Sequence, residues 1–299
     1  MTLPSRSSSR SAAVDWEAAA YPTFVGVGAR KAGTTLLHSW LVDHPEVCVP
    51  ADRKEVEFFT RYYERGMAWY RSLFRPTVEK AVGEFSVTYL ESAEGIARLA
   101  RDLPQVKCIV SLRDPVSRLE SQFRDLARIN AYRGDYQNLV AGHPEVVERG
   151  RYGEQLDRLA RTFPRERLHV IVCEDLTSAP ERVARDLYEF VGVDAAHVPA
   201  TLRARLNPAG GVRSSAVQRT RQRAKELAIN HDLRWLLRLA RSRPARRLQS
   251  LNAASDRPPA WTMGPDLARD LRRAFEPDVR AVSRFLDRDM SEVWRAGTR

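Results

Sequence analysis

The chain has 299 residues, a net charge of +11 at pH 7 and 43% hydrophobic residues. This length suits one large α/β core, and no apolar run approaches the roughly 18 to 20 residues of a membrane span, so we expect a soluble globular protein. Residues 201–247 hold 13 Lys and Arg against two Asp and Glu, a surplus equal to the net charge of the whole chain. A general nucleic-acid binder would spread its charge over a face of the domain, so no nucleic-acid partner is expected.

Residues 1–21 are rich in Ser, Arg and Ala and are expected to form a disordered tail. From residue 22 on, apolar β-rich runs alternate with helical patterns. The expected strands are 23–27, 80–84, 106–112 and 168–173, and the expected helices are 34–42, 93–102, 116–129, 154–162 and 180–191. Buried strands that alternate with helices predict an α/β fold with a P-loop-like parallel sheet flanked by helices, whose ligands bind beyond the carboxyl ends of the strands.

The regular alternation fades after residue 193. Residues 207–213 are loop-like, 214–241 are helical and arginine-rich, and 243–259 resemble a mobile connection. A final amphipathic helix is expected over 267–285, with Pro277 inside it. We therefore expect a single domain over 22–299, with 201–260 as a basic helical C-terminal subregion.

The three cysteines, Cys48, Cys108 and Cys173, are odd in number and widely spaced. No pair of them has the spacing of metal ligands, so free buried thiols are expected. Free thiols are typical of a reducing compartment, and the predicted location is the cytoplasm.

The stretch from Phe24 to Leu37 reads as a buried strand, a glycine-punctuated turn and a helix that begins on two threonines. The first amides of a helix are unpaired donors at the positive end of its dipole, so this turn favours a phosphate, and Lys31 adds a full positive charge. A Walker loop has its lysine directly after the second glycine. Lys31 instead precedes Gly33 by two residues, so the pattern does not indicate ATP with magnesium. An ordinary strand-to-helix turn is the alternative.

A second element runs from Cys108 to Ser121, where a strand ends and a helix begins at Pro115 with Asp114 as its cap. Arg113 offers a rigid fork suited to phosphate, and Ser121 a neutral donor two turns along the helix. An ion pair between Arg113 and a neighbouring carboxylate is the alternative.

The third element is Lys54-Glu-Val-Glu-Phe-Phe59. Glu55 or Glu57 could serve as a general base that accepts a proton from an attacking hydroxyl or amine. In an extended segment both carboxylates would point to the same side, so periodicity does not separate them. A solvated turn with mutually paired charges is the alternative.

Together the three elements resemble the sulfotransferase family that uses 3'-phosphoadenylyl sulfate (PAPS), above all the heparan-sulfate-type domain and its bacterial relatives. Arg30-Lys-Ala-Gly-Thr-Thr35 is similar to the family's R-K-G-G-T loop for the 5'-phosphosulfate, and Lys54 to Phe59 to its K-E-x-x-F-F segment. Further similarity lies at 66–70, 163–176 and 275–294, so that the resemblance covers roughly residues 22–295.

The resemblance implies a role for each matching residue. Glu55 would be the base, and Lys31 would stabilise the bridging oxygen and the departing phosphate. The 5' end of PAPS would be held by Arg30, Lys31, Ala32, Gly33, Thr34 and Thr35, and its 3'-phosphate by Arg113, Ser121 and Arg213. Sulfuryl transfer relies on positioning and charge stabilisation, and no metal is expected to be required.

Some positions depart from the family pattern. Ala32 stands where the family more commonly has glycine. Alanine fits this position of the loop if the φ of Ala32 is negative. Phe85, within Glu84-Phe-Ser-Val-Thr-Tyr89, stands where heparan-type enzymes carry a second lysine, which argues against heparan sulfate itself as acceptor. The disulfide of the secreted animal enzymes has no counterpart, and the histidine base of the cytosolic small-molecule enzymes is absent after the second strand.

The predicted function is therefore transfer of a sulfuryl group from PAPS to a hydroxyl or amine of a carbohydrate, glycolipid or secondary-metabolite acceptor. One alternative is a nucleotide-dependent kinase, which would need a Gly-Lys-Ser/Thr loop that the chain lacks. Another is a nucleic-acid-binding protein that uses residues 201–247, where aromatic stacking residues are sparse. We interpret that segment first as a cofactor lid and acceptor wall, second as a solvated face, and third as a contact with an anionic membrane surface. The acceptor, the choice between O- and N-sulfation and the oligomeric state stay open.

Overall fold

The computed structural model describes residues 22–204 except 52, 129–131 and 133, the short pieces 211–212, 227 and 253–254, and residues 263–296. The predicted tail over 1–21, most of the predicted basic subregion and Arg213 lie outside the described residues. The predictions made for these segments, and the domain boundaries, stay predictions.

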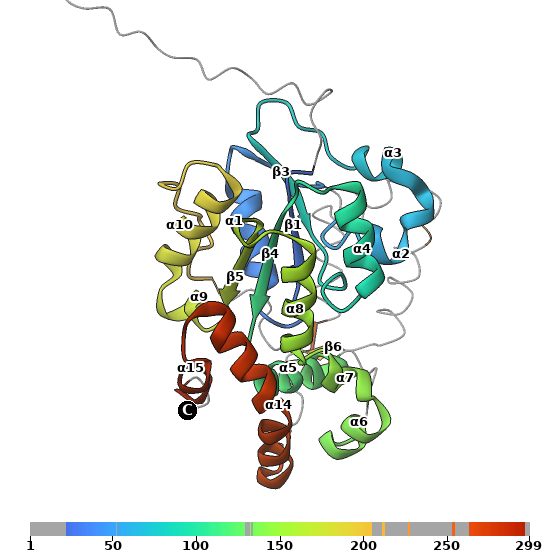
Figure 1. Ribbon diagram of the computed structural model, residues 1–299, viewed down its shortest axis with the longest axis vertical. Coiled ribbons are helices and arrows are strands. Elements are labelled where there is room, and N and C mark those ends of the chain that lie inside the picture. Colours follow the sequence, from blue (N-terminus) through green and yellow to red (C-terminus); the bar gives the residue numbers. More distant parts are fainter. Residues whose placement is uncertain are drawn as a thin grey trace, which may run out of the picture.

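A five-stranded parallel sheet forms the centre of the molecule (Figure 1). Its strands stand in the order β2-β3-β1-β4-β5 and every pair is parallel. The bounds are β1 Phe24–Gly28, β2 Val47–Cys48, β3 Ala81–Phe85, β4 Lys107–Leu112 and β5 Leu168–Val172. All five residues of β1 and of β3 are buried, as expected for parallel strands covered on both faces. The predicted fold class is confirmed.

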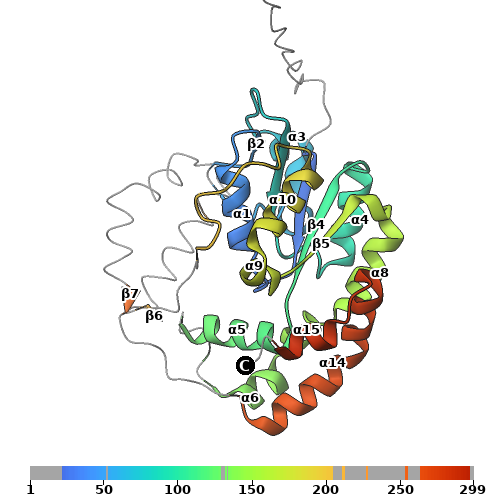
Figure 2. The same ribbon diagram turned by 90° about the vertical axis from the view of Figure 1, so that its left-hand side faces the viewer.

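Helices cover both faces of this sheet (Figure 2). One face packs against α1 Thr34–Asp43, α9 Asp175–Ser178 and α10 Pro180–Val191. The other face packs against α2 Phe58–Arg61, α3 Gly66–Arg71, α4 Ala93–Asp102, α8 Tyr152–Thr162, α14 Pro265–Leu286 and α15 Met290–Ala296. No helix of the described part of the chain is both long enough and apolar enough to span a membrane.

A further layer lies at the carboxyl ends of the strands (Figure 1). It consists of α5 Pro115–Arg128, α6 Tyr136–Gly142 and α7 Pro144–Glu148, which share an apolar cluster with the start of α14. The fully buried Arg118 of α5 donates a hydrogen bond to the carbonyl of Val146 in α7. The helix that begins beside Arg113 is thus fixed within this layer.

The predicted long elements agree with the structure to within about two residues, and α14 contains Pro277 as expected. The prediction did not include the short elements, namely β2, α2, α3, α6, α7, α9, α15, the 3₁₀ turns Tyr63–Arg65 and Arg165–Arg167, and the antiparallel pair β6 Gly211–Val212 and β7 Ala253–Ala254. All three cysteines are free, and burial raises the pKa of the Cys108 thiol to about 12. Cys173 lies just past β5 and is only partly buried.

Candidate active site

The loop after β1 is tied to the neighbouring strand β4. The Ala29 amide donates to the Ser111 carbonyl at 2.7 Å, and the Ser111 hydroxyl donates to the Ala32 carbonyl. Gly33 has a φ of 82°, and a Cβ there would come within 2.4 Å of Leu176 Cδ1. Ala32 is fully buried and is not among the residues with positive φ, so it meets the condition under which alanine can replace glycine. The loop therefore presents the first amides of α1 at the carboxyl edge of the sheet.

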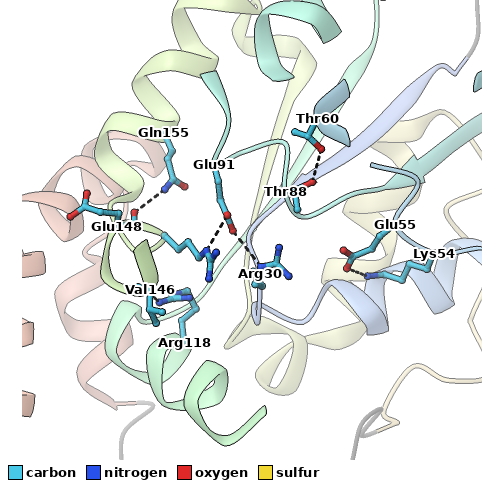
Figure 3. A network of polar contacts seen from close by, with 11 residues as sticks. Arg30, Lys54, Glu55, Thr60, Thr88, Glu91, Arg118, Val146, Glu148 and Gln155 are labelled. Carbon is cyan, nitrogen blue, oxygen red and sulfur yellow. Dashed lines mark hydrogen bonds and ion pairs between the residues drawn. The ribbon is translucent and has the colours of Figure 1, made fainter. Parts of the chain in front are cut away.

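Both cationic side chains of this loop have carboxylate partners. Arg30 Nε lies 3.5 Å from Glu91 Oε1, and the other oxygen of Glu91 lies 3.1 Å from Arg149 Nε (Figure 3). Lys31 Nζ lies 3.2 Å from Asp125 Oδ2 of α5. The two carboxylates and Arg149 come from three segments that are distant from the loop in sequence, and no local sequence signal indicated them.

The second element meets the first. Arg113 follows β4, and its Nη1 donates a long hydrogen bond of 3.5 Å to the Lys31 carbonyl. The predicted helix cap is present, because Asp114 Oδ2 accepts from the Ser117 amide at 2.9 Å and from the Ser117 hydroxyl at 2.7 Å. Asp114 is thus engaged by Ser117. Ser121 lies half-buried on α5, two turns from the start of that helix.

Glu174 supports this element from behind. Its Oε1 accepts from the Asp114 amide at 3.2 Å, and its Oε2 accepts from Trp294 Nε1 of α15 at 3.1 Å. Burial raises the pKa of Glu174, while these hydrogen bonds and the nearby Arg113 act in the opposite direction. Glu174 and Trp294 both lie in stretches that resemble the sulfotransferase family, 163–176 and 275–294. That resemblance did not assign a role to either residue.

The third element is a tight turn, so the alternation of an extended segment does not place both carboxylates on one side. Glu55 has a φ of 67° and Glu57 a φ of 55°, a left-handed conformation that costs a non-glycine residue about 1 to 3 kcal/mol. Glu57 stands at the N-cap position of α2 without a side-chain capping hydrogen bond, and its Oε2 lies 3.9 Å from Arg61 Nη1 one turn along that helix. The two carboxylates therefore have different surroundings, which the sequence pattern alone did not separate.

Lys54 links this turn to the loop after β1. Its Nζ lies 3.4 Å from Glu55 Oε1 (Figure 3). It also lies 3.5 Å from Thr34 Oγ1. Burial lowers the pKa of the Lys54 ammonium, and the Glu55 and Glu84 carboxylates act against that shift. The Glu55 side chain keeps 30% of its surface exposed, so solvent or a substrate can reach it.

Behind the turn lies a buried carboxylate that sequence reasoning did not single out. Glu84 on β3 is 1% exposed and accepts hydrogen bonds from the hydroxyls of Ser86 at 2.7 Å, Tyr89 at 2.7 Å and Tyr70 at 3.3 Å. Burial raises the pKa of Glu84 to about 7, and these hydrogen bonds act in the opposite direction. Its neighbour Phe85 belongs to the apolar cluster on the opposite face of the sheet, so the position of the family's second lysine is filled by a core side chain.

The three elements therefore share one edge of the sheet, where the loop after β1 contacts both Arg113 and Lys54. A parallel sheet with a glycine-bearing loop and a cationic strand end at its carboxyl edge defines an α/β protein with a site suited to anions.

Comparison with known proteins shows which family this chain is similar to. Residues 88–197, which include Arg113 and Ser121, match the sulfotransferase family. Heparan sulfate glucosamine 3-O-sulfotransferase 6 of Homo sapiens is 31% identical over 182 residues, which cover 58% of this chain and 53% of that protein. The membrane-associated sulfotransferase kil1 of Dictyostelium discoideum is 25% identical over 266 residues, with 58% of this chain and 56% of that protein covered. The chain thus spans about half the length of these relatives.

A crystal structure extends the likeness beyond the matched region. A sulfotransferase from Alicyclobacillus acidocaldarius superposes with a TM-score of 0.68 and 26% identity, and the match covers 93% of this chain and 100% of that one. These findings confirm the resemblance stated from the motifs: residues 88–197 match the sulfotransferase family, and the fold is similar to that of a solved sulfotransferase.

Proposed function

We propose that this protein transfers a sulfuryl group from PAPS to a hydroxyl or amine of a carbohydrate, glycolipid or secondary-metabolite acceptor. The observation that carries the proposal is the meeting of three elements at one edge of the sheet. Arg113 contacts the Lys31 carbonyl and Lys54 contacts Thr34, so a phosphate loop, a second cationic position and an accessible carboxylate lie together.

The residues at this edge fit a donor with two separate anionic groups. Gly33 lets the loop pack closely against Leu176, since a Cβ there would come within 2.4 Å of that side chain. The first amides of a helix are unpaired donors that suit an anion. We assign the 5'-phosphosulfate to Arg30, Lys31 and residues 32–35. The 3'-phosphate is assigned to Arg113 and Ser121, with Arg213, which lies outside the described residues, as a further proposed ligand.

When bound, PAPS supplies the sulfuryl group and leaves as adenosine 3',5'-bisphosphate. Glu55 is proposed to accept the proton of the acceptor hydroxyl or amine, which its exposed carboxylate can reach. Lys31 is proposed to stabilise the negative charge that develops at the 5' side. In the described state its ammonium is held by Asp125, so it must exchange that partner to act.

The acceptor class is proposed from the relatives. The human relative is named for sulfation of glucosamine in heparan sulfate, which supports a carbohydrate acceptor, whereas the core position of Phe85 argues against an identical acceptor site. The cytoplasmic location stays a proposal that rests on the cysteines. One relative is named as membrane-associated, so contact of the basic segment with an anionic membrane surface also stays a proposal.

A screen of acceptors with labelled PAPS tests the reaction. Heparosan oligosaccharides with N-acetyl, N-sulfo or free amino groups, a neutral glycolipid and a simple phenol make up the panel, and Glu55→Gln serves as the matched control. Label should enter one class with the wild type in the presence of EDTA. Label transfer that EDTA abolishes and magnesium restores would contradict the metal-free proposal. Phosphoryl transfer from ATP without any sulfuryl transfer would favour the kinase alternative.

A further inference from the structure

The turn that carries Glu55 is held mainly by the end of β3. The Glu55 amide donates to the Phe85 carbonyl at 3.1 Å, and the Glu57 amide donates to the Ser86 hydroxyl oxygen at 2.9 Å. Both glutamates have positive φ, a conformation that a non-glycine residue keeps only where its surroundings enforce it. These two hydrogen bonds therefore fix the position of the backbone from which the Glu55 side chain extends.

The bond to Glu57 depends on Glu84. A serine hydroxyl carries a single hydrogen, and Ser86 donates it to Glu84 Oε2 at 2.7 Å. Its oxygen is then oriented to accept from the Glu57 amide. Ser86 is fully buried and Glu84 is 1% exposed, so solvent does not compete for either bond.

A second contact runs from Glu84 to the same turn through aromatic rings. Tyr70 of α3 donates its hydroxyl to Glu84, and its ring stacks on Phe58 with centroids 4.5 Å apart. Phe58 is the first residue of α2, the helix whose N-cap position Glu57 occupies. One buried carboxylate thus holds the turn from both sides.

We propose that Glu84 is a positioning residue for the base: through Ser86 and Tyr70 it holds the turn of residues 54–57 in the shape that presents Glu55 to the acceptor. The inference rests on the proposed function, because it assigns the base role to Glu55. Glu84 itself touches no substrate and acts only through the turn.

Ser86→Ala tests this link by removing one buried atom. We expect turnover with the best acceptor of the panel to fall by about 10- to 100-fold, as is typical when a residue that orients an active-site group is lost. Affinity for adenosine 3',5'-bisphosphate, measured by calorimetry, should not change, because the loop after β1 is not involved. Glu84→Gln should lower turnover in the same direction.

Tyr63→Phe is the matched control. Tyr63 also donates its hydroxyl to a carboxylate, Asp102 Oδ2 at 2.6 Å, but that carboxylate is the last residue of α4 rather than part of β3. The Tyr63 ring contacts Phe58 with centroids 5.3 Å apart, and the change to Phe keeps this ring contact while it removes the hydroxyl. This variant should lose thermal stability without loss of turnover. A general effect of weakening the core would instead lower turnover in Tyr63→Phe as well, and that result would overturn the proposal.

Two further measurements separate this inference from the proposed function. In a double-mutant cycle, Ser86→Ala should cost far less in a Glu55→Gln background, since a residue that acts through Glu55 loses its effect without it; equal losses in both backgrounds would overturn the positioning role. Hydrogen exchange at the Glu57 amide needs no substrate, and it should quicken in Ser86→Ala. If the wild type transfers no sulfuryl group, the proposed function is wrong. Hydrogen exchange then still tests whether Ser86 holds the turn. Unchanged exchange would overturn the inference whatever the activity.

Discussion

The loop after β1 and the turn before α2 lie at the same edge of the sheet but are built in different ways. The loop offers mainly backbone amides, and it contains both a glycine and a non-glycine residue with positive φ, Gly33 at 82° and Lys31 at 68°. The turn offers a side chain, and two glutamates take left-handed conformations without any glycine. Where backbone amides form a site, its geometry depends on which residues can adopt the required backbone conformation. Where a side chain forms the site, its position depends on residues outside the turn that fix the backbone of the turn, here Ser86 and Glu84.

The sharpest test of this comparison separates the two glutamates of the turn. Glu55→Gln keeps the shape of the side chain and removes the proton acceptor, so we expect turnover to fall by about 10²- to 10⁴-fold with nucleotide affinity nearly unchanged. Glu57→Gln should cost far less turnover, because the Glu57 carboxylate lies near Arg61 of α2 rather than near Lys54. Steady-state kinetics and calorimetry on both variants check the expectation. A dead Glu57→Gln beside an active Glu55→Gln would reverse the assignment.

The loop side should respond in binding rather than in chemistry. Arg113→Ala should weaken binding of adenosine 3',5'-bisphosphate by about 1.5 to 3 kcal/mol, roughly 10- to 150-fold, and leave 5'-AMP binding nearly unchanged. Arg161→Ala, an arginine with 78% of its side chain exposed on α8, is the control and should bind both nucleotides like the wild type. If calorimetry shows equal losses of affinity for the two nucleotides, Arg113 does not bind the 3'-phosphate.

A change in the backbone itself is expected to act on stability as well as on binding. Gly33→Ala places a Cβ within 2.4 Å of Leu176 at a positive φ, so we expect a loss of roughly 2 to 4 kcal/mol in the free energy of unfolding and weaker nucleotide binding. Gly142→Ala is the matched control, since a Cβ there meets nothing within 4 Å. Chemical denaturation of both variants measures the difference. A Gly33→Ala protein as stable as wild type would show that the loop shifts freely, contrary to the comparison above.

The smallest effect concerns the carboxylate behind the turn. The pKa of Glu84 is about 7 in the folded chain against an ordinary value of 4.5, so the folded state keeps its proton at pH values where the unfolded state has lost it. This contribution to stability is fully present below the ordinary pKa and is lost as the pH rises through 7. Tyr70, Tyr89, Ser86, Lys54 and Glu55 face this group, and none of them is replaced in Glu84→Gln.

We therefore expect the difference in melting temperature, wild type minus Glu84→Gln, to decrease by a few degrees from about pH 5 to pH 8. Each kcal/mol of stability corresponds to roughly 2 to 4 °C in melting temperature. Scanning calorimetry at both pH values measures it. A difference that grows with pH would mean that Glu84 is held in its charged form, and the three hydroxyl donors would then outweigh its burial.

Sequence reasoning found the parts of the molecule that have a periodic or compositional signal. The long strands and helices, the capping role of Asp114 and the glycine of the loop were all predictable because each depends on residues next to it in the chain. β2 and α2, with two and four residues, are too short for any period to be read.

The supporting residues of the site were not predictable for a different reason. Glu84 reads as one polar residue in a strand, and its role arises only when Tyr70 and the turn fold against it. Glu91 and Asp125 reach the loop from separate segments, and Arg149 binds Glu91 from a third. The left-handed glutamates also carry no sign in the sequence, because glycine is the residue that normally marks such a position.

The hydrogen bond between Trp294 and Glu174 joins residues 120 positions apart. A ribosome adds about 5 to 20 residues per second, so a nascent chain waits roughly 6 to 24 s between making Glu174 and making its partner. During that interval the carboxylate that accepts the Asp114 amide has no tryptophan to orient it. We expect a growing chain to complete its central sheet first and to gain full nucleotide affinity only after α15 has left the ribosome, so that chains stopped ahead of Trp294 fold partly but bind poorly.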